Sequence, residues 1–335
     1  MNALISLALV AGFFLVGVAG ASLGMEWAFA VALPYAALAL FVGGLVYKVM
    51  TWASVPVPFR IPTTCGQQKS LGWIRQDRLD NPSGLPGVLG RMALEVLLFR
   101  SLLRNTRTEQ VDGRRRLVYH TSLWLWAGAM AMHWAMLVVL IRHLRLVTEP
   151  VPALVAFIEK ADGFMEVGVP VVFASSVVFL AGATFLLLRR VVIPQVRYIS
   201  LVGDWFPLLL LLGIGGSGLW IRHVTKIDVA AVKELMLGLA HLSPVVPEAV
   251  GPLFYGHLFL VCVLVAYFPV SKLMHAPGVF LSPTRNLANN NRAIHHDNPW
   301  NHPVKVHSYE EYEDELRDKM IKAGLPVDRQ PAERE

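Results

Sequence analysis

The stretch PLFYGHLFLVCVLVAYFPVSKLMH, residues 252–275, decides the fold of this chain. It is predominantly apolar and long enough to cross the hydrocarbon core of a bilayer, which takes about 20 residues of α-helix. It also carries His257 and His275, which are 18 positions apart. In a continuous helix that spacing equals five whole turns, so the pattern predicts two imidazoles on one face, about 27 Å apart along the axis.

The rest of the chain has the same apolar character. Of its 335 residues, 55% are hydrophobic and only 16% are charged, against about a quarter charged in soluble domains. Six stretches are long enough to span a bilayer; they lie at 3–22, 27–50, 122–145, 165–188, 200–222 and 252–275. We therefore predict an all-α integral membrane protein with six transmembrane helices and a cytoplasmic loop and tail.

These spans predict how the chain is divided. The parts are an N-terminal helix in 1–26, a second helix in 27–50, an amphipathic cytoplasmic segment in 51–121, a four-helix region that carries the intramembrane histidines in 122–275, and a cytoplasmic tail in 276–335. Ala19-Gly20-Ala21 is similar to a signal-peptidase site, which would remove the first helix. The chain lacks the basic start of a signal peptide, so we favour a retained helix.

The distribution of Lys and Arg predicts the orientation. Both residue types are frequent in 51–121 and 189–199, whereas 146–164 holds one base, Lys160, among acidic residues. The positive-inside rule then places 51–121, 189–199 and both chain termini on the cytoplasmic side of the cell inner membrane. The net charge of +6 comes mainly from these basic segments beside the membrane spans, so we do not expect nucleic-acid binding.

Histidines inside a membrane are the first candidates for function, because ionisable groups there are costly. His133 and His143 lie 10 positions apart in the third span, about 15 Å along its axis. His120 is more typical of the cytoplasmic interface, since it lies between Arg114-Arg115-Arg116 and Trp124.

The third and sixth helices are antiparallel, and each would hold histidines at two depths. This arrangement favours two stacked bis-histidine haems, which leave the iron no open site and suit electron transfer. The alternative is that the histidines bond between helices or line a proton path. Cys65 and Cys262 are too few for an iron–sulfur cluster, so any cluster would belong to a partner.

The motifs around these histidines resemble a known family. Residues 254–257 (FYGH) and 268–275 (FPVSKLMH) are similar to the last helix of the respiratory nitrate reductase gamma subunit family, which has histidine pairs 18 and 10 apart. That resemblance covers about residues 27–275 and leaves the first helix as an addition to a five-helix di-haem bundle. Residues 56–64 (PVPFRIPTT) and 282–290 (SPTRNLANN) extend a closer resemblance, over nearly the whole chain, to the DsrM family, the membrane cytochrome b subunits of DsrMKJOP complexes.

The resemblance implies two b haems, an outer one held by His143 and His257 and an inner one held by His133 and His275. It also implies menaquinol oxidation and electron delivery to a cytoplasmic iron–sulfur subunit related to heterodisulfide reductase, in dissimilatory sulfite reduction. The other partners implied are a multihaem cytochrome c, an iron–sulfur protein and a second membrane subunit that interacts with quinone.

Quinol oxidation requires one group that binds the hydroxyl and one that accepts its proton. Lys160 is our candidate for the first role, because the nitrate reductase gamma family places a quinol-binding lysine in a similar stretch. The candidate proton acceptors are Glu159, Asp162 and Glu166, with ordinary helix-capping charges as the alternative. Candidates for haem propionates, or for snorkelling to the interface, are Arg142, Arg145 and Arg222.

The polar segments carry two further helix predictions. Residues 92–99 (MALEVLLF) favour an amphipathic helix on the membrane surface, and Ser308 with Glu311 predicts a capped helix over 308–323. Both regions are candidates for docking the iron–sulfur partner. The competing functions for the whole chain are a histidine-using transporter or proton channel and a structural membrane anchor.

Overall fold

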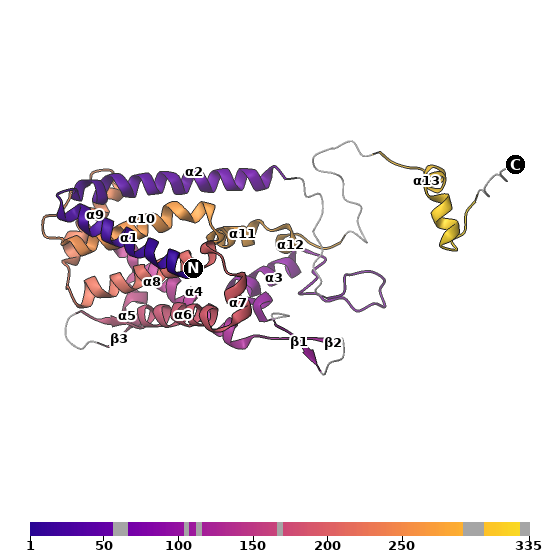
Figure 1. Ribbon diagram of the computed structural model, residues 1–335, viewed down its shortest axis with the longest axis horizontal. Helices are drawn as coiled ribbons and strands as arrows, with labels where there is room; N and C mark the ends of the chain where they lie inside the picture. Colours follow the sequence, from indigo (N-terminus) through magenta and orange to yellow (C-terminus); the bar gives the residue numbers. More distant parts are fainter. Residues whose placement is uncertain (56–65, 104–106, 112–115, 166–169, 291–304, 329–335) are drawn as a thin grey trace.

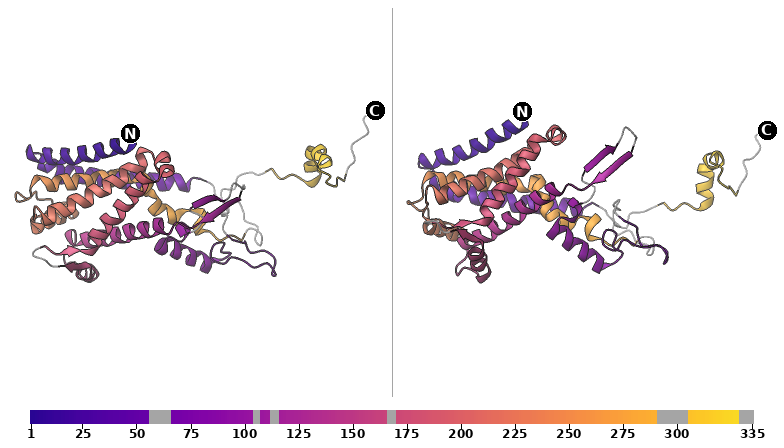
Figure 2. Two further views of the ribbon diagram at one scale, coloured as in Figure 1. Left: turned by 60° about the horizontal axis from the view of Figure 1, so that its bottom comes forward. Right: turned by 90° about the horizontal axis from the view of Figure 1, so that it is seen from below.

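The computed structural model describes residues 1–55, 66–103, 107–111, 116–165, 170–290 and 305–328. Six long helices run side by side through the described residues (Figure 1 and Figure 2), and all six are apolar and long enough to cross a membrane. They are α1 (Asn2–Ser22), α2 (Leu33–Ala53, after the π-helical turn η1, Ala28–Ala32), α4 (Leu123–His143), α6 (Ala174–Val192), α8 (Val202–His223) and α10 (Pro252–Tyr267). The predicted all-α fold with six spans is confirmed.

The helices pack in a chain of neighbours. α4 packs on α6, α6 on α8, and α8 on α10, while α1 lies against α8 and α10 and α2 lies against α10. Small residues bring some of them to backbone contact. A Cβ atom on Gly17 of α1 would lie 2.8 Å from Cα of Gly256 on α10, and one on Gly182 of α6 would lie 3.0 Å from the backbone nitrogen of Met132 on α4. Close approach of this kind stabilises helix pairs in lipid.

The sixth span differs from the prediction of one continuous helix over 252–275. α10 ends at Tyr267 and is followed by two 3-10 turns, η4 (Phe268–Val270) and η5 (Lys272–Met274). Ser271 between them is extended, with φ −112° and ψ 174°. Pro269 lacks a backbone N–H and cannot continue the helical hydrogen bonds. The five-turn argument for a shared face is therefore wrong, because His275 lies beyond the break, at the start of α11 (His275–Leu281).

The connections on one side of the bundle contain elements that the sequence did not predict. α5 (Ala153–Asp162) and the hairpin of β3 (Gly163–Met165) and β4 (Val172–Phe173) precede α6, and α9 (Val229–Ala240) links α8 to α10. The fourth span consequently begins at Ala174, not at 165 as predicted. Both α5 and α9 lie towards the left end of the bundle in Figure 1, α9 near its top and α5 near its bottom. We call this the outer end.

The opposite end carries the chain start and the polar segments. Asn2 Nδ2 donates to the backbone oxygen of Ser200, 3.2 Å away, so α1 begins beside the short helix α7 (Pro194–Ile199) in the basic connection. We call this the inner end. The polar loop forms α3 (Leu85–Leu98), the 3-10 turn η2 (Arg100–Leu103) and an antiparallel pair, β1 (Arg107–Val111) and β2 (Arg116–His120). His120 thus ends a strand and is not part of the third helix.

The polar tail contacts this loop. α11 leads into α12 (Pro283–Asn286), which packs on α3. Beyond α12, the buried Asn289 donates from its backbone to the oxygen of Pro82 (2.7 Å) and from its side chain to Asn81 (2.6 Å). The predicted helices over 92–99 and 308–323 are confirmed as α3 and α13 (Tyr309–Lys322), the latter with the Ser308–Glu311 capping box.

Candidate functional site: two histidine pairs between antiparallel helices

His133 and His275 form a pair at the inner end. Their ring centroids are 6.1 Å apart and the ring planes are nearly perpendicular, at 82°. His133 lies on α4, and His275 begins α11, just after the break that ends the sixth span. The 3-10 turn before His275 is anchored to α8 by an ion pair of 2.5 Å between Lys272 Nζ and Asp204 Oδ1.

His143 and His257 form the second pair, towards the outer end. His143 is the last residue of α4 and His257 lies in the second turn of α10, and the two side chains are close enough to interact electrostatically. The pairs are thus separated by the 10 residues of α4 from His133 to His143, about 15 Å of helix.

All four imidazoles are held through Nδ1. The backbone oxygens of Ala129, Val139 and Lys272 accept hydrogen bonds of 2.7 Å from His133, His143 and His275. Since a carbonyl can only accept, Nδ1 carries the proton in each ring and Nε2 keeps its lone pair. Oriented imidazoles with a free Nε2 are what metal ligation requires.

His257 has a different Nδ1 partner. The hydroxyl of Ser217 lies 2.9 Å away and itself donates to the backbone oxygen of Ile214 at 3.1 Å. The hydroxyl proton is therefore committed to Ile214, and Ser217 accepts from Nδ1–H of His257. The next residue, Gly218, leaves room for the ring, because a Cβ there would lie 3.2 Å from Cε1 of His257. No motif or spacing in the sequence singles out Ser217.

This donor set fits bis-histidine haem ligation. It provides two pairs of imidazoles, each ring held through Nδ1, with one member of each pair on α4 and the other on α10 or α11. No group of three or more His, Cys, Asp and Glu side chains that could hold a metal ion occurs among the described residues, so the histidines come as pairs.

A buried charge network lies beside the outer pair. Arg142, next to His143, forms a 2.8 Å ion pair from Nε to Asp162, in which both side chains are less than a tenth exposed. It also donates to the hydroxyls of Ser175 and Ser176 at 3.1 and 3.0 Å, and its guanidinium lies 3.7 Å from the ring centroid of Phe173. Asp162 in turn accepts from Ser175, from the backbone N–H at 2.8 Å and from the hydroxyl at 2.6 Å.

The other outer candidates are placed differently. Arg145 pairs with Glu159 of α5, and the exposed Lys160 follows on the same helix. Arg222 stacks on Phe173, 5.0 Å from the ring centroid, and its buried Nε has no hydrogen-bond partner among the described residues. Glu166 lies outside the described residues.

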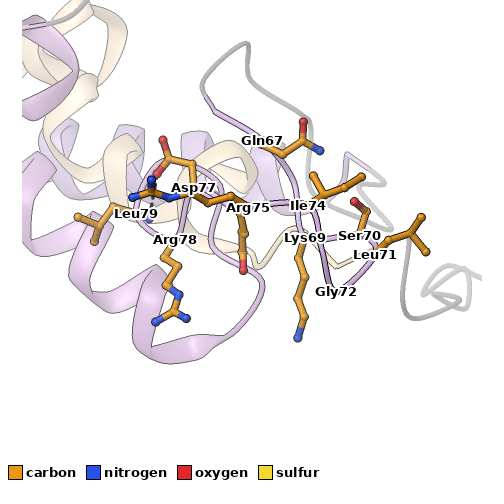
Figure 3. Close-up of a pocket in the computed structure, with 11 residues that line it drawn as sticks. Gln67, Lys69, Ser70, Leu71, Gly72, Ile74, Arg75, Asp77, Arg78 and Leu79 are labelled. Atoms are coloured by element: carbon orange, nitrogen blue, oxygen red, sulfur yellow. Dashed lines mark hydrogen bonds between the residues drawn. The ribbon is translucent and has the colours of Figure 1, made fainter.

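One cavity lies away from the histidines, in the polar loop. It has a volume of about 890 Å³ and is lined by residues between Gln67 and Leu79. In Figure 3 the side chains of Lys69 and Arg78 extend from it in the same direction, and both residues are exposed. It is a feature of the inner end and shares no residue with either histidine pair.

Two histidine pairs at two depths of a multi-pass helical bundle are the kind of donor set that membrane cytochromes of the b type use. The chain belongs to the nitrate reductase gamma subunit family, whose model matches residues 91–292, more than half of its length. The match includes all four paired histidines and begins after α1 and α2, so it is shorter at the N-terminal side than the resemblance expected from the motifs. Membership of this cytochrome b-like family implies haem b.

Two curated relatives extend the similarity. The chain is 44% identical over 279 residues to the "Hdr-like menaquinol oxidoreductase cytochrome b-like subunit" of Archaeoglobus fulgidus, covering 81% of this chain and 83% of the relative. It is 40% identical over 276 residues to the protein of the same name from Archaeoglobus profundus, covering 80% and 81%.

Proposed function

We propose that this chain is the di-haem b membrane subunit of a menaquinol-oxidising complex. In this proposal, His143 and His257 hold the outer haem and His133 and His275 hold the inner one. Electrons from menaquinol enter near the outer pair and leave from the inner pair to a cytoplasmic iron–sulfur subunit related to heterodisulfide reductase. The names of the two relatives support the substrate and the type of complex.

The observation that carries the proposal is the pairing of the four histidines with every Nδ1 bonded. A proton-path histidine exchanges its proton and so needs a partner that can both donate and accept. Three of the four Nδ1 atoms are bonded to carbonyl oxygens, which hold one tautomer in place and suit a metal ligand. Haem iron bound by two imidazoles cycles between the ferrous and ferric states and carries one electron at a time.

The chain's own residues have separate tasks at the outer end. We propose that Lys160 hydrogen-bonds the quinone, because it is exposed on α5, and that the neighbouring Glu159 accepts a proton. Asp162 is a weaker candidate for the acceptor, since Arg142 and Ser175 already use its oxygens. Arg145 and Arg222 retain guanidinium donors for propionates, and Arg142 is largely committed to Asp162 and the two serines.

The orientation and partners belong to the same proposal. The basic loop and the chain start lie at the inner end, and the tail contacts that loop, so both termini are cytoplasmic if Lys and Arg follow the positive-inside rule. An assembly of the DsrMKJOP type in sulfite reduction would add a multihaem cytochrome c, an iron–sulfur protein and a second quinone-interacting membrane subunit. The exposed loop carrying Lys69 and Arg78 is a candidate docking surface for the cytoplasmic partner.

The decisive experiment is spectroscopic. The purified protein should give a b-type α band in a reduced-minus-oxidised spectrum, with two haems per chain by pyridine haemochrome assay. A menaquinol analogue should reduce both haems, and Lys160→Ala should slow that reduction while leaving the spectrum unchanged. A colourless protein would contradict the proposal and favour a transporter or proton channel. Full-rate reduction in Lys160→Ala would remove only this residue from the quinol site.

A further inference from the structure

Phe99 has an unusual backbone conformation directly beside the inner histidine pair. It is the C-cap of α3, with φ 49° and ψ 45°, in the left-handed region. Helices that end in this conformation usually place Gly or Asn there, because a bulky side chain is strained. The chain therefore retains a large aromatic residue where the local backbone favours glycine.

The ring of Phe99 contacts His133. The two ring centroids are 5.1 Å apart and the planes cross at 86°, an edge-to-face arrangement that aromatic rings prefer. His133 also crosses His275, at 82° with the ring centroids 6.1 Å apart. The His133 ring therefore has one aromatic neighbour from the end of α3 and one from α11.

Hydrogen bonds from α4 fix the place of this ring. The indole N–H of Trp126 donates to the backbone oxygen of Leu98 at 2.7 Å, and that of Trp134 donates to Leu97 at 3.1 Å. These two carbonyls are among those left unpaired at the end of α3. The end of α3 is therefore attached to the same helix that carries His133, on the residues just before Phe99.

The polar tail also contacts α3, through Arg285 of α12. Glu95 forms an ion pair with Arg285 of α12, and its carboxylate accepts from the hydroxyl of Ser101 at 2.7 Å. Arg285 also donates to that hydroxyl at 3.1 Å. Phe99 lies between Glu95 and Ser101 in sequence, so these contacts close the turn around it.

We infer that Phe99 is a positioning residue of the inner site: its ring sets the plane of the His133 imidazole and shields that imidazole, the less exposed of the inner pair, from water. This inference rests on the proposed function where it concerns the haem. Water stabilises the more highly charged ferric form, and burial of a haem is one of the levers that set its reduction potential. Removing the ring should therefore shift the inner haem to a more negative potential.

The test compares Phe99→Gly with Leu242→Gly in the full-length protein. Leu242 also has a positive φ, 58°, but it follows α9 at the outer end and is 80% exposed. Both changes relieve the same kind of backbone strain, and only the first removes a ring from a histidine. A redox titration should show one of the two haems shifted to a more negative potential in Phe99→Gly, with neither shifted in Leu242→Gly.

A second variant separates the ring from the backbone. Phe99→Leu keeps an apolar side chain beside His133 and the same backbone conformation, but it lacks the aromatic ring. It should broaden the electron paramagnetic resonance signal of the inner haem. Its shift in reduction potential should be smaller than that of Phe99→Gly. Unchanged potentials and signals in both Phe99 variants, or an equal shift of both haems, would overturn the inference. Absence of haem from the unmodified protein would instead overturn the proposed function.

Discussion

The hydroxyl of Ser217 accepts a hydrogen bond from Nδ1 of His257 across the α8–α10 contact, at 2.9 Å. The other three paired histidines use backbone oxygens for the same purpose. A carbonyl partner cannot be removed by substitution, whereas a serine hydroxyl can. Of the four paired histidines, His257 is therefore the one whose Nδ1 partner can be removed by a substitution.

Ser217→Ala should weaken the outer haem site and leave the inner one unchanged. Loss of a partner that orients a ligating histidine typically costs about 10-fold to 100-fold in metal affinity. Haem titration of protein expressed without added haem would measure this loss. Ser217→Thr keeps the hydroxyl and should bind haem normally, and equal loss in both variants would contradict the role given to the hydroxyl.

Gly218→Val should displace the ring of His257. A Cβ at this position would already lie 3.2 Å from Cε1 of His257, and valine adds two methyl groups. We expect one haem per chain instead of two by pyridine haemochrome assay. Gly216→Val is the matched control on the same helix, because no atom lies within 4 Å of a Cβ there; it should keep both haems.

Gly17→Val should separate α1 from α10. The added Cβ would lie 2.8 Å from both Cα of Gly256 and the backbone oxygen of Tyr255, which cannot move aside without shifting a helix. Overpacking of this kind costs about 1–3 kcal/mol, measurable as a lower thermal unfolding midpoint in detergent. Gly12→Val, with open space around its Cβ, should unfold like the unmodified protein; equal loss in both would exclude the packing explanation.

Asp162→Asn should destabilise the outer end far more than a comparable change at an exposed pair. It leaves the buried guanidinium of Arg142 without its counter-charge, and breaking a buried ion pair typically costs about 3–5 kcal/mol. Glu149→Gln is the control, since the pair of Glu149 with Lys233 is much more exposed and such pairs contribute about 1 kcal/mol or less. Similar unfolding midpoints for the two variants would show that Asp162 is not structural.

The number and type of the spans could be predicted because both depend on composition. Apolar runs of about 20 residues have few alternatives in lipid, where every backbone group must be bonded within a helix or barrel. The helix that begins after Ser308 could also be predicted, because the capping box is a local sequence motif. The pairing of the four histidines around two haems stays a prediction.

The details that position the histidines could not be predicted from periodicity. The 18-residue spacing pointed to a single helix, but Pro269 and the extended Ser271 interrupt it, and the position of His275 depends instead on the contact between Lys272 and Asp204. Phe99 looked like one more apolar residue of an amphipathic stretch. Its importance depends on a backbone conformation and a partner 34 positions away, neither of which leaves a local signal.

The interruption at Ser271 places His257 and His275 on two different helices, α10 and α11. α11 continues into α12, where Arg285 is tied to Glu95. A displacement of the tail would therefore reach His275 through α12 and α11, whereas no continuous helix leads on from there to His257.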